Sequence, residues 1–453
     1  MGEEKKVFKK IIIAVFIGLL VSLLGTEAFN TQQSILLGIV AFLVTLWTNE
    51  GLPLGVVSLM PIILFPAFGI ISTKATTINY AHPIIYLFLG GFLLAIAVEK
   101  TGLHIRIADK ILNIFPDTPR AMILSLAITA GVLSAILSNT TTTLLLISIA
   151  LFITENEKLK LRFALAIAYG ASIGGILTPI GTPPNLILLG IMQNNSMETI
   201  PFFQWVVMVA PLSVIMVFIM SWLLSLGVND LKVSRYVELP TLSNAQKKVI
   251  FLLVSLIVLL FVNAPIKPYW NGLGLNESGI LLAFGLMLFL PPFNILEWEE
   301  DHKKIPYRII MLFGAGFSIA KGFVETGLAD ELASYLLAMT DLPPLVLLFS
   351  IAFLITFSTE ITSNTALISI MLPVIYSVSE QSGINTTLFM MVATLCASYA
   401  FMLPIATPPN AIAMSSGAVR VKNMLRYGIV LNLLGIFFIV MVAEFYWKGI
   451  FFK

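Results

Sequence analysis

The sequence predicts an all-α polytopic membrane protein with about 11 transmembrane helices arranged in two inverted repeats. Of its 453 residues, 58% are hydrophobic and only 11% are charged, whereas an average soluble domain has about 25% charged residues. Apolar runs of about 15–20 residues recur along the whole chain, and a helix of that length crosses most of a hydrocarbon core about 30 Å thick. Nothing alternates between apolar and polar residues with period two, so the spans are helical.

Eleven apolar segments are expected to cross the membrane. They are 11–25, 34–49, 51–71, 82–100, 161–193, 204–228, 249–264, 278–293, 307–324, 387–417 and 427–449. The first follows four lysines, but no small-residue cleavage site comes after it, so we expect a retained helix. Prolines break 161–193 and 387–417 near the middle, because proline removes a backbone donor and clashes with the preceding turn.

Two more apolar regions, 119–155 and 343–379, are interrupted at their centres by Ser, Asn and Thr residues. In the first region the second arm, 143–153, has 11 residues, which is too short to cross the membrane. We therefore expect both regions to be re-entrant hairpins, each of which enters and leaves the membrane on one side.

The basic residues indicate the orientation. With a cytoplasmic N-terminus and two re-entrant hairpins, 21 of the 26 Lys and Arg residues fall inside the cell, as the positive-inside rule requires. Counting either hairpin as a crossing would invert every later loop and remove this bias. We expect a multi-pass protein of the bacterial inner membrane, with its N-terminus in the cytoplasm and its C-terminus outside. A cytoplasmic linker, 229–248, carries Lys232 and Arg235.

The two halves of the chain share motifs at one offset, 225 residues. Thr101-Gly102-Leu103 recurs as Thr326-Gly327-Leu328, Ser138-Asn139-Thr140 as Ser363-Asn364-Thr365, and Thr182-Pro183-Pro184-Asn185 as Thr407-Pro408-Pro409-Asn410. Because an odd number of crossings separates equivalent points, the repeats face opposite sides, which is the inverted-repeat architecture of secondary transporters. The alternative is a gene duplication whose repeated segments serve only helix packing. The expected units are an N-terminal helix at 1–33, a first repeat at 34–228 and a second repeat at 249–453.

Residues 138–143, Ser-Asn-Thr-Thr-Thr-Thr, form the expected tip of the first hairpin. Ser, Asn and Thr are N-cap and turn residues, so they end one short helix and begin the next. The free N–H groups and the positive dipole end of the second helix then attract anions without an arginine. The simpler alternative is that these side chains hold helices together by hydrogen bonds, but the recurrence of the tip in the second half favours binding.

Residues 178–185, Thr-Pro-Ile-Gly-Thr-Pro-Pro-Asn, are not compatible with a continuous helix. Carbonyl groups near Gly181 lose their helical partners, which is tolerable inside a membrane only where they line a cavity or bind an ion. Pro183 and Pro184 suit the first turn of a new helix. Freed carbonyls together with Ser, Thr and Asn oxygens resemble a cage for a hard monovalent cation, and the paired helix starts resemble a carboxylate site. A proline kink that serves packing alone is the alternative.

Other classes of function find little support. The single Cys396 excludes an internal disulfide, and three scattered histidines exclude a His-rich metal site. These histidines, His82, His104 and His302, lie at the edges of predicted spans or in loops. An intramembrane enzyme needs a nucleophile and a base, and no His or Cys lies near either motif. A channel would show charged rings or a carbonyl filter at the tips. The net charge of +2 does not indicate a nucleic-acid partner, since the basic residues follow the topology.

Glu360 lies inside the second hairpin, four residues before Asn364. An intramembrane carboxylate is either a proton relay or a structural support for the tip, and we favour the structural role. Four acidic residues lie near span ends, where we expect them to be solvated or paired with a nearby base: Glu50, Glu99, Glu277 and Glu325.

Paired Ser-Asn-Thr tips, each followed 44 residues later by a Thr-Pro-Pro-Asn break, resemble the divalent anion/sodium symporter family. The resemblance covers nearly the whole chain, including both hairpins and both broken helices. It implies a secondary active transporter that takes up C4-dicarboxylates such as succinate, malate and fumarate, with Na+ as the coupling ion. It also implies a homodimer in the lipid bilayer, in which a transport domain moves like an elevator against a static scaffold.

The resemblance further implies which residues bind. Substrate would contact Ser138, Asn139, Thr140, Thr182, Pro183, Ser363, Asn364, Thr365, Thr407 and Pro408. One sodium ion would contact Ser134, Ser138, Asn139 and Gly181, and the other Thr359, Thr362, Asn364 and Ala406. The internal offset supports this assignment, because Ser134 matches Thr359 and Gly181 matches Ala406. No catalytic residue is implied.

Two positions depart from the family pattern. A run of four threonines follows Asn139, in which an alanine is often found in the family, and Thr362 replaces a small apolar residue. A dicarboxylate exchanger and a sulfate or citrate transporter with the same fold remain the alternatives. No cationic side chain replaces a proposed sodium ligand, which favours the symporter.

Overall fold

The computed structural model describes residues 2–152, 154–228, 241–265, 269–336 and 342–451. These residues form helices joined by turns and loops, with no strand among them, so the predicted all-α class is confirmed. Twelve residues of the predicted linker, 229–240, including Lys232 and Arg235, lie outside the described residues.

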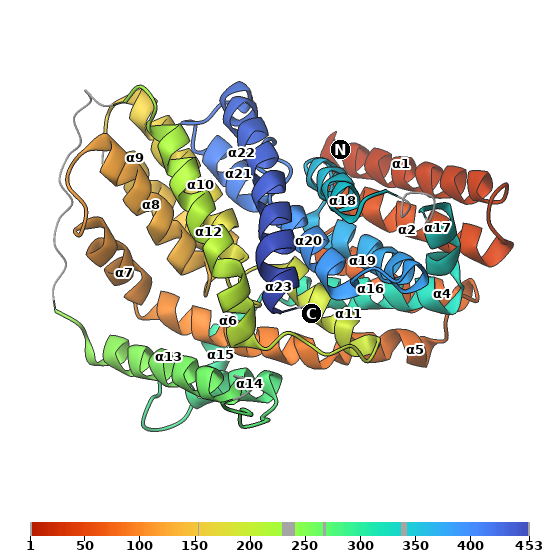
Figure 1. Cartoon of the computed structure of the whole chain (residues 1–453), viewed down its shortest axis with the longest axis horizontal. Coiled ribbons are helices and arrows are strands. Elements are labelled where there is room, and N and C mark those ends of the chain that lie inside the picture. The colour runs from red at the N-terminus through yellow and green to blue at the C-terminus, as the bar shows by residue number, and fades with distance from the viewer. Residues whose placement is uncertain (1, 153, 229–240, 266–268, 337–341, 452–453) are drawn as a thin grey trace.

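The helices of the first half vary widely in length. They are α1 (Gly2–Gly25), α2 (Thr31–Asn49), α3 (Leu54–Leu59), α4 (Pro61–Ala67), α5 (Thr73–Thr77), a 3₁₀ turn (Ile78–Ala81), α6 (Pro83–Lys100), α7 (Leu103–Leu112), α8 (Pro119–Ser134), α9 (Asn139–Phe152), α10 (Glu157–Gly175), α11 (Pro183–Asn194) and α12 (Phe202–Ser225). Two of the longest, α1 and α2, pack against each other at one end of the molecule (Figure 1).

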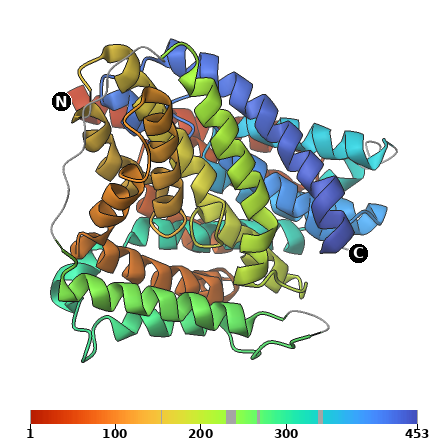
Figure 2. The same cartoon turned by 60° about the vertical axis from the view of Figure 1, so that its left-hand side comes forward.

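The second half repeats this mixture of long and short helices. It contains α13 (Asn244–Asn263), α14 (Glu277–Met287), α15 (Trp298–Asp301), a 3₁₀ turn (His302–Lys304), α16 (Tyr307–Glu325), α17 (Leu328–Leu336), α18 (Pro344–Thr359), α19 (Asn364–Ser382), α20 (Thr386–Ser398), α21 (Pro408–Ser415), α22 (Val421–Val442), a π-helical turn (Ala443–Trp447) and α23 (Lys448–Ile450). α13 and α14 lie side by side along one edge, next to α6 (Figures 1 and 2).

Seven helical segments of the described chain are long and apolar enough to cross a membrane. They are Glu4–Gly25, Thr31–Asn49, Thr73–Lys100, Phe202–Ser225, Asn244–Asn263, Tyr307–Glu325 and Val421–Ile450. They overlap seven of the eleven predicted spans. These seven segments make the chain a multi-span membrane protein. The other four predicted spans consist of shorter or broken helices, so the count of eleven stays a prediction.

Prolines and turns divide two of those four spans. The predicted span 51–71 is interrupted at Met60 between α3 and α4, because Pro61 has no N–H to continue the helix. The predicted span 278–293 is helical only to Met287, and Pro291 and Pro292 follow within a turn. Both segments are therefore shorter as helices than the apolar runs indicated.

The hairpins and broken helices pack across the two halves of the chain. α10 lies against α8 and α9 of its own half, and α20 lies against α18 and α19 of its own half. The second helix of each broken span packs against a hairpin helix of the other half: α11 packs against α19, and α21 packs against α9. At Gly174 a Cβ atom would lie 2.2 Å from the Gly131 Cα, so only glycine permits α8 and α10 to approach this closely. Each hairpin tip thus lies beside broken helices from both halves.

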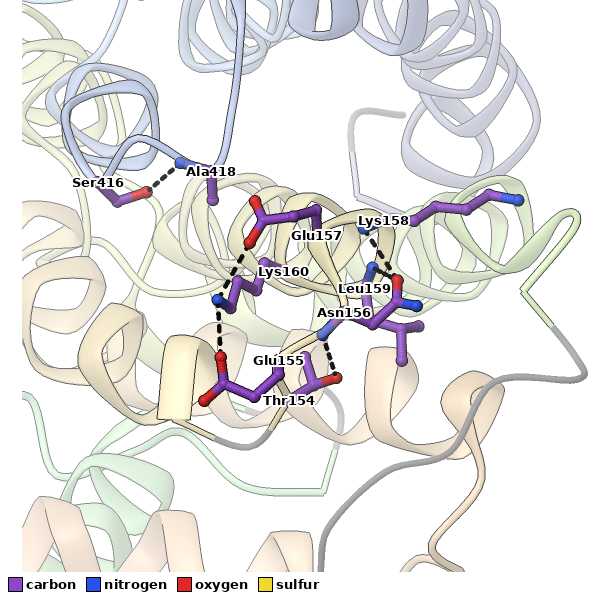
Figure 3. Close-up of polar contacts among 9 residues, drawn as sticks. All are labelled: Thr154, Glu155, Asn156, Glu157, Lys158, Leu159, Lys160, Ser416 and Ala418. Carbon is purple, nitrogen blue, oxygen red and sulfur yellow. Dashed lines mark hydrogen bonds and ion pairs between the residues drawn. The ribbon is translucent and has the colours of Figure 1, made fainter.

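A polar turn joins the first hairpin to the first broken helix (Figure 3). The Asn156 side chain accepts hydrogen bonds from the N–H groups of Lys158 and Leu159, at 3.0 and 3.2 Å, and so caps α10. Lys160 lies between two exposed carboxylates, 3.3 Å from Glu155 and 3.1 Å from Glu157. Such exposed pairs contribute little stability, so the cap is the main reason why α10 begins here.

The end of α6 is held by a buried carboxylate outside the predicted spans. Asp301 accepts hydrogen bonds from Lys100 at 2.7 Å, Lys304 at 3.1 Å and the Glu297 N–H at 2.9 Å. Burial by itself raises the pKa of this carboxyl, but these three donors outweigh burial and lower the pKa of Asp301 below its usual value. The ionised carboxylate ties α6 to the loop that precedes α16.

Candidate functional site

A cavity of about 750 Å³ lies where the hairpin tips meet the helix breaks. All ten residues predicted to contact substrate line it: Ser138, Asn139, Thr140, Thr182, Pro183, Ser363, Asn364, Thr365, Thr407 and Pro408. Of the predicted sodium ligands outside this set, Gly181 and Ala406 also line the cavity, whereas Ser134, Thr359 and Thr362 are not among its lining residues. The two halves therefore supply matched residues to one chamber.

Four helices begin at this cavity. α9 starts at Asn139, α11 at Pro183, α19 at Asn364 and α21 at Pro408. The first N–H groups of a helix have no partner within that helix, and they carry its positive dipole end. Four such ends around one chamber create a positive potential without a cationic side chain on either tip or break. The chamber therefore suits an anion that carries more than one negative group.

The two hairpin tips contain the same hydrogen bond. In the first half the Ser134 hydroxyl donates to the Asn139 Oδ1 at 2.5 Å. In the second half the Thr359 hydroxyl donates to the Asn364 Oδ1 at 2.6 Å. Each bond joins the last residue of one hairpin helix to the first residue of the next. The predicted sodium ligands Ser134 and Asn139, and likewise Thr359 and Asn364, thus lie in direct contact.

The remaining predicted sodium ligands lie near these pairs to different degrees. Gly181 packs beside the first pair, since a Cβ on it would lie 3.0 Å from the Ser134 carbonyl oxygen. Ser138 accepts a hydrogen bond from the Thr141 N–H at 3.1 Å, within the turn that begins α9. Thr362 donates its hydroxyl proton to the Ser358 carbonyl at 2.7 Å, which leaves only its oxygen lone pairs for an ion.

The threonines at the two breaks are left free to bind. Thr182 and Thr407 are the N-cap residues of α11 and α21, but neither side chain accepts the usual capping bond. The Thr407 hydroxyl is buried and has no partner within the described structure. A buried hydroxyl without a partner is unfavourable by about 1–3 kcal/mol, so this group is positioned for a ligand.

Glu360 supports the second break rather than opening into the cavity. Its carboxylate is buried and accepts hydrogen bonds from the N–H groups of Met402 and Leu403, both at 2.9 Å. The Asn432 amide of α22 donates to it at 2.7 Å. The equivalent position in the first half is Ala135, whose carbonyl accepts the Thr178 hydroxyl at 2.5 Å. Both halves tie hairpin to break at this point, and the contacts agree with the structural role.

Replacing Glu360 with glutamine is expected to lower the free energy of unfolding by about 1–3 kcal/mol, because the new NH₂ group must face a buried backbone N–H. Thermal unfolding of the purified protein in detergent measures this loss of stability. Glu325→Gln is the control, since Glu325 forms only an exposed pair with Lys321. Unchanged stability with altered proton movement would instead support the relay.

Sequence reasoning missed the walls and mouth of the cavity. Phe88 and Phe92 of α6 and Leu312 of α16 supply apolar surface, and the exposed Arg308 and Glu50 lie among the lining residues. The apolar residues do obey the internal offset, because Phe88 and Phe92 recur as Phe313 and Phe317, and Leu312 matches Leu87. Glu50 was expected to be solvated or paired with a nearby base at a span end. The cavity lining thus includes a cationic side chain, Arg308, that the motifs did not indicate.

Two of the histidines are more enclosed than expected. His82 and His104 were placed at edges or loops, but both are buried. His82 contacts Asn194 at 3.1 Å, and His104 contacts the Val98 carbonyl at 3.2 Å. Neither is among the residues that line the cavity.

A multi-span helical protein with a central anion-attracting chamber, built from two hairpin tips and two broken helices, belongs to the class of membrane transporters. A family model described as citrate transporter matches residues 39–393. The sodium-dependent dicarboxylate transporter SdcS of Staphylococcus saprophyticus is 33% identical, with 90% of this chain and 85% of that protein covered. SdcS of Staphylococcus aureus is 32% identical, with coverages of 98% and 93%.

This chain therefore belongs to the family that these transporters form, as its resemblance to divalent anion/sodium symporters predicted. Two solved transporter structures share the fold. YdaH of Alcanivorax borkumensis has a TM-score of 0.59 at 16% identity, covering 82% of this chain and 86% of that chain. MtrF of Neisseria gonorrhoeae has a TM-score of 0.57 at 15% identity, with coverages of 82% and 83%.

Proposed function

We propose that this protein is a sodium-coupled transporter that takes up C4-dicarboxylates such as succinate, malate and fumarate. The observation that carries the proposal is the chamber at which four helices begin, two from each half of the chain. A dicarboxylate has two anionic ends, and each half offers one hairpin tip and one broken-helix start for a carboxylate. The relatives named as sodium-dependent dicarboxylate transporters support the same substrate class and coupling ion.

In this proposal, substrate carboxylates accept hydrogen bonds from the tips and the break threonines. Ser138, Asn139 and Thr140 act with Thr182 in the first half, and Ser363, Asn364, Thr365 and Thr407 act in the second. Pro183 and Pro408 line the chamber between them. A neutral site of this kind binds a dianion through dipoles, so the bound negative charge is balanced by the coupling cations.

Sodium is a hard cation that prefers oxygen ligands, and the proposed sites offer hydroxyl, amide and carbonyl oxygens. Ser134, Ser138, Asn139 and Gly181 hold one ion, and Thr359, Thr362, Asn364 and Ala406 hold the other. Asn139 and Asn364 belong to both the substrate and the sodium sets. Sodium binding therefore orders each tip before the substrate arrives, which couples the two fluxes.

Transport requires the chamber to open alternately on the two sides of the membrane. We propose an elevator-type motion, in which the hairpins and broken helices move as a unit against the remaining helices of a homodimer. The repeats are inverted in this proposal, with the N-terminus in the cytoplasm and the C-terminus outside. The cross-packing of α11 on α19 and of α21 on α9 supports movement of these elements as one body.

The test is uptake of radiolabelled succinate into liposomes that contain the purified protein, with and without an inward sodium gradient. Uptake that requires the gradient supports the proposal. Uptake that requires internal dicarboxylate and ignores sodium would identify an exchanger. If succinate is not transported, citrate and sulfate are the next substrates, and the citrate transporter family model makes citrate the first of them.

A further inference from the structure

Each Thr-Pro-Pro-Asn motif ends in an asparagine that is not part of the proposed substrate or sodium sites. Asn185 and Asn410 are each the third residue of a helix, α11 and α21 respectively, and both are fully buried. Their side chains do not point along their own helices. Each reaches back across the break towards the end of the preceding helix segment.

The contacts of the two asparagines are equivalent. The Asn185 amide nitrogen donates to the Thr178 carbonyl at 2.9 Å and, at a longer 3.5 Å, to the Gly175 carbonyl. The Asn410 amide nitrogen donates to the Leu403 carbonyl at 3.0 Å and to the Ala400 carbonyl at 2.9 Å. Every one of these positions obeys the offset of 225 residues. The structure thus contains the same bridge twice.

Each bridge anchors the turn that carries a proposed sodium ligand. The Thr178 carbonyl also accepts the Gly181 N–H at 3.3 Å, and the Leu403 carbonyl accepts the Ala406 N–H at 3.3 Å. The asparagine and the ligand residue therefore share one carbonyl acceptor. Movement of the amide would move the turn, and with it the carbonyl group that faces the ion.

Only an amide of this length suits the position. Its NH₂ group supplies two donors to two carbonyls, whereas a carboxylate in the same place would be repelled by both. Among the residues that the structure describes, the amide oxygens of Asn185 and Asn410 have no hydrogen-bond partner. A buried acceptor without a partner is destabilising, and such local conflicts are expected where function rather than folding determines the residue.

We propose that Asn185 and Asn410 are positioning residues, each of which holds the helix break in the geometry that its own sodium ion requires. The inference rests on the sodium sites assigned under Proposed function. The asparagines do not touch the ion themselves. They fix the turns 178–181 and 403–406, so their loss weakens sodium binding more than succinate binding.

The experiment compares Asn185→Ala and Asn410→Ala with the control Asn195→Ala. Asn195 lies at the other end of α11, and its amide donates to the Ile191 carbonyl at 2.9 Å, away from the cavity. We expect the sodium concentration for half-maximal uptake to rise about tenfold or more in Asn185→Ala and Asn410→Ala, while the succinate KM at saturating sodium changes less than threefold. Asn195→Ala should match the wild type in both.

A second readout does not depend on transport. Sodium added to the substrate-free protein in detergent should raise its unfolding temperature, and Asn185→Ala and Asn410→Ala should need higher sodium concentrations for the same rise. Asn185→Asp, which keeps the size but loses both donors, should behave like Asn185→Ala. A lower unfolding temperature with an unchanged sodium dependence would overturn the proposal and leave the asparagines purely structural.

The direct-ligand variants Ser134→Ala and Thr359→Ala separate this inference from the sodium sites on which it rests. If they shift the sodium dependence and the asparagine variants do not, the positioning role is wrong and the sites stand. If none of the four variants shifts it while wild-type uptake needs sodium, the assigned sites are wrong. Sodium-independent uptake by the wild type would contradict the proposed function itself.

Discussion

Alanine in place of Asn139 or Asn364 is expected to reduce sodium-driven succinate uptake about 100-fold or more. Each asparagine begins a helix at the cavity, and its Oδ1 holds the hydroxyl of Ser134 or Thr359. The substitution removes a proposed contact to substrate and a ligand to sodium together. Losing about 2.7 kcal/mol of binding corresponds to a 100-fold loss of affinity, and two contacts to charged groups supply at least that much.

Initial uptake rates in liposomes, corrected for the amount of inserted protein, measure this effect. Asn113→Ala is a suitable control, because Asn113 is exposed at the end of α7 and is not a lining residue of the cavity. Wild-type rates in Asn139→Ala, with intact sodium dependence, would remove the first tip from the site. Loss in one asparagine variant only would mean that a single half of the chain binds the substrate.

Alanine at Gly181 is expected to reduce sodium-dependent uptake at least about tenfold. A Cβ at this position would lie 2.4 Å from the Gly175 carbonyl oxygen and 3.0 Å from the Ser134 carbonyl oxygen. Both neighbours are backbone atoms, so the turn itself must shift, and the Gly181 carbonyl shifts with it. Displacements of this size are sufficient to disrupt coordination, because ligands must be held within about 0.5 Å of their productive positions.

The reverse substitution, alanine to glycine, at Ala406, which matches Gly181 in the repeat, provides a comparison for Gly181→Ala. Ala406 already carries a Cβ and is buried, so Ala406→Gly should keep uptake within about threefold of wild type, the range expected for a small rise in backbone freedom. Gly279→Ala on α14 is the control for added volume, because the nearest atom to its new Cβ is 3.9 Å away. Full sodium-dependent uptake in Gly181→Ala would show that the first break does not position an ion.

Helix boundaries near the site were largely predictable because they depend on neighbours along the chain. Pro183 and Pro408 each occupy the first turn of a helix, as their missing N–H and fixed φ dictate. Asn139 and Asn364 likewise begin helices, each directly after a serine, Ser138 or Ser363. The apolar runs were less informative about length, since α14 ends at Met287 although hydrophobic residues continue beyond it.

The residues of the candidate site were implied by the family resemblance, and the internal repeat pairs them across the two halves. All ten substrate positions lie on one cavity. Its walls were not predictable, since an apolar residue such as Phe88 looks the same in a sequence whether it faces lipid, the core or a substrate. Arg308 was missed for a similar reason: its charge had already been explained by the topology.

The helical membrane class, the helix breaks and the doubled motifs follow from the sequence alone, since composition, proline and local hydrogen bonding act over a few residues. The differences between equivalent positions become visible only in the packed structure. Gly181 and Ala406 match in the repeat, but the carbonyls of Gly175 and Ser134 leave no space for a Cβ at Gly181. Glu360 matches Ala135, but packing brings its carboxylate to the N–H groups of residues 402 and 403. The contacts of Gly181 with Ser134 and of Glu360 with residues 402 and 403 join segments about 40 residues apart or more. They therefore depend on how whole helices pack rather than on any local pattern.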